Sequence, residues 1–441
     1  MKKFILFFTL FPLLSLAQKN YPALLDEYMQ GQLKHYEFSG AVLVTQKGKI
    51  VYEKAFGEAN REWNISNTVD TKFMIGSLTK TFTAAAILQL VEQGKLSLDT
   101  KLNQFIPEFP HGETVTIHML LNHTSGIPGY TNLPRFSSVM TLPFSRDSVI
   151  AFFKNEPFDF TPGSKYKYSN SGYFLLGYII EKVSGQSYEK YIQENLIKKA
   201  GLTNTGVNRT DSILAKRACS YIKTPRGWRN AAYISMEFPF SAGAIFSTVE
   251  DMQRWNTALF SAKIVSQASL TKMTTPYMGK YGYGTHIDTL GNHHHIGHSG
   301  GIQGFQTNIE WYPVDEVCTI VLSNNSVGAT NVAEALAALL FDMPVQMPYP
   351  HKETKIDVNR LANYMGKYMT ANNQYMELLI KGDKVYRRLE NGREFELKPE
   401  SDSRLFFPDG DNYINFTVDE KGKPRTALTS YGVTKDMKKI E

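Results

Sequence analysis

Two pairs of strand-like runs, at opposite ends of the first 340 residues, constrain the fold of this chain most strongly. SGAVLVTQKGKIVYEKAFG turns at Lys47-Gly48, and FQTNIEWYPVDEVCTIVLSN turns around residues 313–315. Alternating apolar residues around a short turn are typical of a β-hairpin. Helical patterns lie between the hairpins, including residues 77–93 and 172–185. This order predicts an α+β domain, in which the two chain ends form an antiparallel sheet around an inserted helical region.

Three prolines in seven residues, Pro344, Pro348 and Pro350, follow the second hairpin and a helix-like run. We expect a linker at residues 344–355, between a main domain at 18–343 and an all-β domain at 356–441. Short strand-like runs and glycine-containing turns in the last domain predict a small antiparallel barrel or sandwich. These runs are YMELLI, KVYRRL, EFELKP, RLFFP, YINFTV and RTALTSY.

The first residues, MKKFILFFTLFPLLSLAQ, have the order of a secretory signal peptide. Two lysines precede an apolar run from Phe4 to Leu14, and the small-residue pattern Ser15-Leu16-Ala17 follows it. The run is shorter than a comfortable membrane span, and no later segment has 18 consecutive apolar residues. We expect residues 1–17 to be a signal peptide and the protein to be exported, with no stable membrane span; an uncleaved anchor is the alternative.

Charge and metal-ligand spacing exclude several functional classes. The formal net charge is +6 without a clustered basic run, so we expect no nucleic-acid binding. Cys219 and Cys318 could pair or remain free, and neither belongs to a C-x-x-C motif. The run His293–His295 cannot aim three side chains at one ion, because adjacent strand residues point to opposite faces. We expect no metal, no cofactor and a monomer.

Ser77 and Lys80 open the helical pattern GSLTKTFTAAAILQLVEQG. On a helix they lie one turn apart on the same face, which places an amine beside a hydroxyl. A serine hydroxyl is a poor nucleophile unless a base lies within hydrogen-bond distance. The S-x-x-K spacing alone is equally consistent with a helix cap and a solvated lysine.

Two further motifs lie in segments where side chains or a substrate can approach closely. The YSN motif at residues 168–170 precedes a helix, in a loop where side chains can converge on a site. The HSGG motif at 298–301 follows a strand-like run, and its glycines allow close backbone approach. The same segment fits G-x-S-x-G, the nucleophile elbow of α/β-hydrolases. The strand-like residues that follow it, and the position of the only later histidine, His351, in the linker, argue against an elbow.

Taken together, Ser77-x-x-Lys80, the YSN motif and the HSGG motif have the order and approximate intervals of three motifs of serine β-lactamases and penicillin-binding proteins. The chain most closely resembles class C β-lactamases and their DD-peptidase and esterase relatives, over about residues 25–340. HTSG, FTPG and SAGAIFSTVEDMQRW are further similar stretches. The resemblance implies a five-stranded antiparallel sheet flanked by helices, an all-helical lobe and a site between them. The last domain resembles the lipocalin-like barrel appended to many members.

Carried over residue by residue, the resemblance implies a role for each motif position. Ser77 would be the nucleophile, Lys80 its activating neighbour and Tyr168 the general base and acid. A Lys80 ammonium would favour the Tyr168 anion. The backbone N–H groups of Ser77 and Gly301 would form an oxyanion hole. The substrate-binding residues would be Asn170, His298, Ser299 and Gly300.

The sequence thus predicts an exported hydrolase that forms an acyl-enzyme on Ser77. The bond cleaved would be an amide or ester in a D-alanyl peptide, an ester, a β-lactam or another small molecule, with cell-wall peptides among the candidates. Most β-lactamases of this type have lysine in place of His298, and histidine is only partly charged at pH 7. We therefore do not expect efficient penicillinase activity. Two alternatives remain: an α/β-hydrolase-type esterase using Ser299, and a penicillin-binding-like receptor that acylates slowly or not at all.

Overall fold

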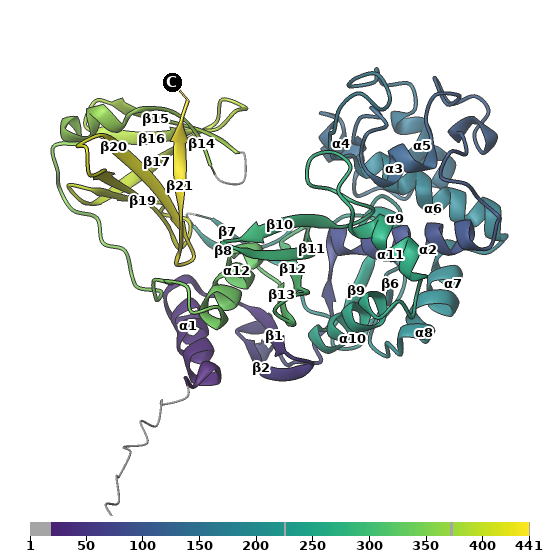
Figure 1. Cartoon of the computed structure of the whole chain (residues 1–441), viewed down its shortest axis with the longest axis horizontal. Helices are drawn as coiled ribbons and strands as arrows, with labels where there is room; N and C mark the ends of the chain where they lie inside the picture. Colours follow the sequence, from purple (N-terminus) through teal and green to yellow (C-terminus); the bar gives the residue numbers. More distant parts are fainter. Residues whose placement is uncertain (1–18, 225, 371–373, 441) are drawn as a thin grey trace, which may run out of the picture.

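The computed structural model describes residues 19–440 except residue 225 and residues 371–373 (Figure 1). The predicted signal peptide at 1–17 lies outside the described residues. Among the described residues, no helix is both long and apolar enough to cross a membrane.

An antiparallel sheet forms the centre of the main domain, and its six strands within the described chain have the order β10-β11-β12-β13-β1-β2. Gly40 of β1 pairs with Ser323 of β13, so the two ends of the domain meet in the sheet, as predicted. The resemblance implied five strands; residues 286–290 add a sixth at the edge, pairing with the first half of β11. The strands are β1 (Gly40–Gln46), β2 (Lys49–Phe56), β10 (His286–Leu290), β11 (His293–Ile302), β12 (Phe305–Tyr312) and β13 (Val317–Ser323).

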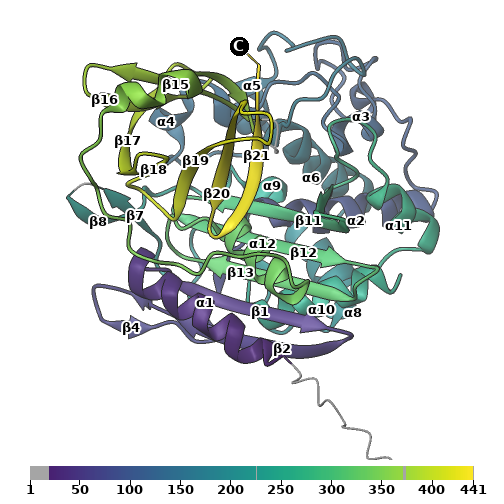
Figure 2. The same cartoon turned by 60° about the vertical axis from the view of Figure 1, so that its left-hand side comes forward.

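Helices cover both faces of the sheet. The central strands are therefore apolar on both faces and not only on one. Val42 and Val44 pack with α1 (Tyr21–Tyr36) and α12 (Ala329–Leu340). Ala41 and Leu43 belong to a second core on the opposite face, which includes α10 (Val249–Phe260). Figure 2 shows α1 and α12 in front of the sheet. The sheet is therefore the middle layer of three.

The helical lobe is built around α2 (Thr79–Glu92) and α6 (Asn170–Ser184). Every residue of α2 from Thr79 to Leu90 is buried, its polar side chains included, so this helix is enclosed on all sides. Ser169 caps α6 by accepting a hydrogen bond from the Gly172 backbone, and Gly185 ends it in a left-handed conformation. The other helices and turns here are η1 (Gly76–Leu78), η2 (Leu102–Gln104), α3 (Ile117–Leu121), η3 (Tyr130–Asn132), α4 (Phe136–Val139), α5 (Arg146–Phe153), α7 (Tyr188–Ile192), η4 (Gln193–Ile197), α8 (Lys198–Ala200), α9 (Phe240–Gly243) and α11 (Gln267–Thr274).

In the described chain, seven short strands form two two-stranded sheets, β3-β4 and β7-β8, and one three-stranded sheet, β5-β9-β6. They are β3 (Glu58–Asn60), β4 (Ile65–Ser66), β5 (Phe73–Met74), β6 (Gly206–Val207), β7 (Tyr221–Thr224), β8 (Gly227–Asn230) and β9 (Ile245–Ser247). Of these, β5 pairs with β9 directly before Ser77, so the chain entering the site is held by backbone hydrogen bonds.

The C-terminal residues form a closed antiparallel barrel of eight strands in the described chain, which confirms the predicted all-β architecture. Two strands, β14 and β21, were not among the six predicted runs. An apolar core lies in the barrel and includes Leu361 from η5 (Val358–Tyr364). The strands are β14 (Gly366–Met369), β15 (Tyr375–Lys381), β16 (Lys384–Arg388), β17 (Glu394–Ser401), β18 (Arg404–Phe406), β19 (Asn412–Val418), β20 (Pro424–Ser430) and β21 (Val433–Lys439).

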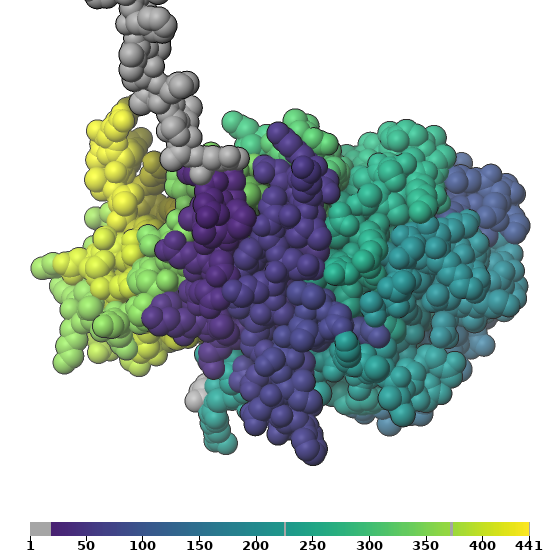
Figure 3. Space-filling view, turned by 90° about the horizontal axis from the view of Figure 1, so that it is seen from below, coloured from purple at the N-terminus to yellow at the C-terminus, as the bar shows by residue number. Residues whose placement is uncertain are grey.

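The barrel contacts the main domain through the turn between β20 and β21. Tyr431 in this turn is buried in the core shared by α1 and α12. The Tyr28 hydroxyl donates to the Tyr431 carbonyl at 2.8 Å, and the Gly328 backbone N–H donates to the Tyr431 hydroxyl at 3.0 Å. Figure 3 shows the purple N-terminal helix lying beside the barrel. These contacts fix the barrel mouth near the start of α12.

Candidate active site

Ser77 lies in η1, where the chain passes from β5 into α2. The preceding Gly76 has a φ of +53°, a left-handed conformation that glycine adopts without strain. A Cβ at Gly76 would lie 3.0 Å from the Gly301 nitrogen, so η1 packs directly against β11. Ser77 therefore lies at the junction of the sheet and the helical lobe.

Lys80 connects the first two motifs. Its Nζ lies 3.1 Å from Ser77 Oγ, 2.8 Å from Asn170 Oδ1 and 2.8 Å from the Ala242 carbonyl oxygen. Lys80 Nζ also lies 4.9 Å from the centroid of the Tyr168 ring. The structure thus brings Ser77, Lys80, Tyr168 and Asn170 together around one amine.

Burial shifts the pKa values of both candidate bases. It lowers the pKa of Lys80 well below its usual value of 10.5. It raises the pKa of Tyr168 above 10, and the hydrogen bond from Ser77 offsets this only in part. The expectation that a Lys80 ammonium would favour the Tyr168 anion is therefore wrong, because loss of hydration dominates at both groups. The buried site favours neutral forms of the amine and the phenol.

The hydrogen bonds of Lys80 define where its lone pair can point. Asn170 Oδ1 and the Ala242 carbonyl can only accept, so two Nζ–H groups are donated to them. The third tetrahedral position faces Ser77 Oγ. In the neutral amine this position is a lone pair, which can accept the Ser77 proton. Asn170 and the Ala242 carbonyl thus orient the amine toward the serine.

His298 lies on β11, where neighbouring protein groups enclose its ring. It is 3% exposed and is not among the described residues that line the pocket at Ser77. The Ser299 carbonyl can only accept, so Nδ1 donates to it at 2.5 Å, and the Tyr281 hydroxyl then donates to Nε2 at 2.9 Å. Burial, followed by the nearby His286 and Lys80, lowers the pKa of His298 well below 6.5. His298 is neutral, both its ring nitrogens are hydrogen-bonded, and its ring centroid lies 6.3 Å from that of Tyr168.

The other residues of the HSGG motif lie on β11. Ser299 pairs with Asn308 in the middle of the strand, which is incompatible with a nucleophile elbow between a strand and a helix. A Cβ at Gly300 would lie 2.1 Å from the Ile75 carbonyl oxygen, so only glycine permits this strand to approach η1. Gly301 follows and lines the same pocket as Ser77, which fits the predicted oxyanion pair.

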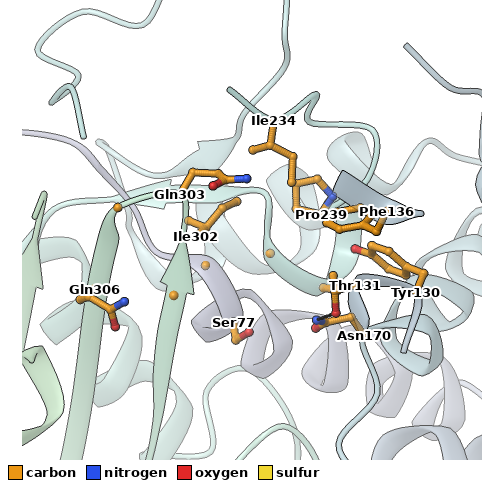
Figure 4. Close-up of a pocket in the computed structure, with 15 residues that line it drawn as sticks. Ser77, Tyr130, Thr131, Phe136, Asn170, Ile234, Pro239, Ile302, Gln303 and Gln306 are labelled. Carbon is orange, nitrogen blue, oxygen red and sulfur yellow. Dashed lines mark hydrogen bonds between the residues drawn. The ribbon is translucent and has the colours of Figure 1, made fainter. Parts of the chain in front are cut away.

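The pocket at Ser77 has a volume of about 300 Å³ (Figure 4). Apolar side chains form one wall, and neutral polar groups surround the serine. None of the described residues lining the pocket carries a charged side chain. They are Gly76, Ser77, Tyr130, Thr131, Phe136, Asn170, Ile234, Pro239, Ala242, Gly243, Gly301, Ile302, Gln303, Gly304 and Gln306.

Three neighbours of the site were not assigned by the sequence. Thr131 accepts a hydrogen bond from Asn170 Nδ2 at 3.1 Å, and Tyr281 holds His298. The His123 ring lies against Tyr168 in a tilted arrangement, with ring centroids 4.3 Å apart, and its Nδ1 accepts from the Ser169 backbone N–H at 3.1 Å. In the sequence, His123 was marked only by its place in the HTSG stretch, which resembles the family. Thr131 and Tyr281 belong to no motif, and their roles follow from tertiary packing.

Histidine burial predicts a loss of stability in acid. Burial lowers the pKa of His123, His298 and His286, the last to about 4. Between that value and 6.5 the unfolded chain binds protons that the folded chain does not. Stability is therefore full above pH 6.5 and decreases as pH falls, by up to about 1.4 kcal/mol per pH unit for each histidine. Urea unfolding between pH 7.5 and 4.5 measures this slope.

Variants separate the histidine contribution from that of carboxylates. We expect His298→Gln to reduce the slope, and His294→Gln, which removes an exposed histidine of the same strand, to leave it unchanged. Equal slopes in all three proteins would show that His298 titrates normally in the folded state.

The antiparallel sheet, the helical lobe and the serine beside a buried lysine and tyrosine define a class, the serine hydrolases that share the penicillin-binding fold. The β-lactamase family model matches residues 24–341, and the chain belongs to the β-lactamase family. It is 32% identical over 303 residues to PbpX of Bacillus subtilis (strain 168), a match covering 68% of this chain and 74% of PbpX.

Two solved structures extend the comparison. The octameric penicillin-binding protein homologue from Pyrococcus abyssi is 28% identical, with a TM-score of 0.67, covering 94% of this chain and 99% of that one. The D-stereospecific amidohydrolase from Streptomyces sp. is 26% identical, with a TM-score of 0.62, covering 70% and 96%. The first match includes the barrel, and the second is confined to about the length of the main domain. The protein is a β-lactamase-family serine hydrolase.

Proposed function

We propose that the protein hydrolyses an amide or ester bond through an acyl-enzyme on Ser77. The observation that carries this proposal is the buried Lys80 amine, 3.1 Å from Ser77 Oγ and oriented by two acceptors. Burial lowers the pKa of Lys80, which makes the neutral, basic form of its amine more accessible than in an ordinary lysine. Lys80 is then the general base, and Tyr168 relays the proton.

The reaction balances with these groups alone. The Ser77 proton moves to the base as Oγ forms a bond to the substrate carbonyl carbon, and the carbonyl π electrons move to oxygen. Backbone N–H groups of Ser77 and Gly301 stabilise that oxyanion, typically by about 3 kcal/mol each. The carbonyl re-forms, the bond to the leaving group breaks, and Tyr168 returns the proton to the leaving atom. Water then attacks the ester, and the proton returns to Ser77.

The pocket favours a substrate that is neutral near the scissile bond. Its described lining contains no charged side chain, and the neutral His298 cannot replace the lysine that holds a substrate carboxylate in most β-lactamases of this type. We propose an amide or ester of a D-amino acid, which the similarity to the D-stereospecific amidohydrolase supports. Penicillins and peptides with a free C-terminal carboxylate would be poorer substrates. The signal-like N-terminus supports action outside the cytoplasm, where cell-wall peptides supply D-residues.

A matched substrate pair tests this specificity. We expect kcat/KM for an acyl-D-Ala-D-Ala amide to exceed that for the same peptide with a free carboxylate by about tenfold, since a charge buried without a partner costs at least that much. The corresponding L-amide should be hydrolysed more slowly than the D-amide. A preference for the free carboxylate would overturn the neutral-substrate proposal while leaving the Ser77 mechanism intact.

Tyr168→Phe tests the relay. Removal of the hydroxyl is expected to lower kcat by about 10²-fold or more with little change in KM, because the proton path is lost and the ring remains. Tyr166→Phe is the matched control and should retain nearly full activity, because Tyr166 lines the neighbouring cavity with His298 and, unlike Tyr168, has no contribution from Ser77 to its pKa. Similar losses in both variants would remove Tyr168 from the relay.

A further inference from the structure

A second cavity lies between the barrel mouth and α12. Its volume is about 530 Å³, and strands of the barrel face the first turn of α12 across it. Among the described residues, it shares none of its lining with the pocket at Ser77. In Figure 1 the ends of β20 and β21 point toward α12, which places this chamber at the seam of the two domains. It is therefore separate from the catalytic pocket.

Strand alternation places a cation inside the barrel. Val385 and Arg387 point to the same side of β16, and Val385 belongs to the apolar barrel core. The Arg387 side chain is only 17% exposed and lines the chamber. Its guanidinium lies 4.2 Å from the ring centroid of Phe407. A guanidinium in such a place is costly unless its donors are satisfied.

The donors of Arg387 are incompletely satisfied within the described chain. Nη2 lies 3.5 Å from Asp409 Oδ2, at the limit of a hydrogen bond, and the Asp409 side chain is 65% exposed. Nε is buried and has no partner among the described residues. The other cation in the chamber, Lys435, donates to Glu334 Oε2 at 2.7 Å and is thereby neutralised. Arg387 is the cation with unused directional donors.

We propose that the chamber binds a small amphiphilic carboxylate, whose head accepts hydrogen bonds from Arg387 and whose apolar body lies against the barrel wall. Arginine holds a carboxylate through two parallel N–H groups, and Arg387 has a buried Nε–H without a partner among the described residues. The apolar lining suited to the body is Met376, Phe407, Leu428 and Met437. The volume accommodates a chain of about eight carbons, since drug-sized pockets begin at about 300 Å³.

Calorimetric titration of the full chain with octanoate and octanamide tests the proposal. Octanoate should bind, and octanamide should bind about tenfold more weakly or worse, because it lacks the charge-assisted pair. Arg387→Gln should lower octanoate affinity by about tenfold. Arg388→Gln is the matched control: the next residue of β16, it points outward and pairs with Glu377 and Glu394, so affinity should change less than about twofold.

Each alternative result overturns the proposal. Equal binding of octanamide and octanoate would exclude a charged head, and equal losses in Arg387→Gln and Arg388→Gln would exclude a specific guanidinium contact. If Arg387→Gln does not fold, hydrogen exchange of the unaltered chain with octanoate tests where the carboxylate binds. Octanoate should then protect β16 and β21, whereas protection confined to η1 and α2 would place octanoate at the catalytic pocket.

Discussion

Replacement of Lys80 by alanine is expected to lower the rate of Ser77 acylation by about 10³-fold or more. The amine is the only nitrogen base within 3.1 Å of Ser77 Oγ among the described residues. Its removal leaves a neutral serine hydroxyl and a Tyr168 hydroxyl with a raised pKa, neither of which accepts a proton readily. Single-turnover hydrolysis of a chromogenic ester measures the acylation step directly.

Two controls distinguish lost chemistry from lost structure. Lys80→Met keeps the buried stem and removes only the amine, so it should be as inactive as Lys80→Ala. Methylamine added to the alanine variant should restore part of the rate, because the vacated space lies between Ser77, Asn170 and the Ala242 carbonyl. Near-normal turnover of either variant would remove Lys80 from the mechanism.

Gly300→Ala is expected to destabilise the protein by about 3 kcal/mol and to abolish most activity. The new methyl would lie 2.1 Å from the Ile75 carbonyl oxygen and 2.4 Å from Thr307 Oγ1, so β11 must move away from η1. That movement separates the Gly301 N–H from Ser77 and opens the oxyanion hole. Urea unfolding and kcat/KM measure the two effects.

Gly301→Ala is the matched control for this substitution. A Cβ at Gly301 would meet only the Gln306 side chain, at 3.6 Å, which is ordinary van der Waals contact. The backbone N–H is retained, so stability should change by less than about 1 kcal/mol and activity should largely survive. A larger loss in Gly301→Ala than in Gly300→Ala would contradict the packing of β11 against η1.

The parts of the fold with strong local patterns were predictable from sequence. Both hairpins have alternating or continuous apolar runs around recognisable turns, and the structure has strands there. The strand at 286–290 and β21 were missed because their residues, HIDTL and VTKDMKK, are largely polar or charged. These strands exist because neighbouring strands supply their hydrogen bonds. A local sequence pattern does not show which distant strands pair with one another.

The candidate site was predictable in its membership and less so in its electrostatics. The S-x-x-K spacing placed Ser77 and Lys80 one helical turn apart, and the resemblance of the three motifs to the β-lactamase family added Tyr168, which directly precedes the cap of α6. The direction of the Tyr168 pKa shift depends on burial by segments far apart in sequence. The pairing of His298 with Tyr281 likewise results from how the 275–285 loop folds back on β11.

The most direct test of the Ser77 assignment is intact mass after reaction with a fluorophosphonate probe, followed by peptide mapping. We expect one adduct per chain on Ser77, absent from Ser77→Ala and strongly slowed in Lys80→Ala. Label on Ser299 would contradict the assignment and restore the elbow hypothesis. Absence of any label from the folded protein would contradict acyl-serine catalysis and favour a non-catalytic receptor.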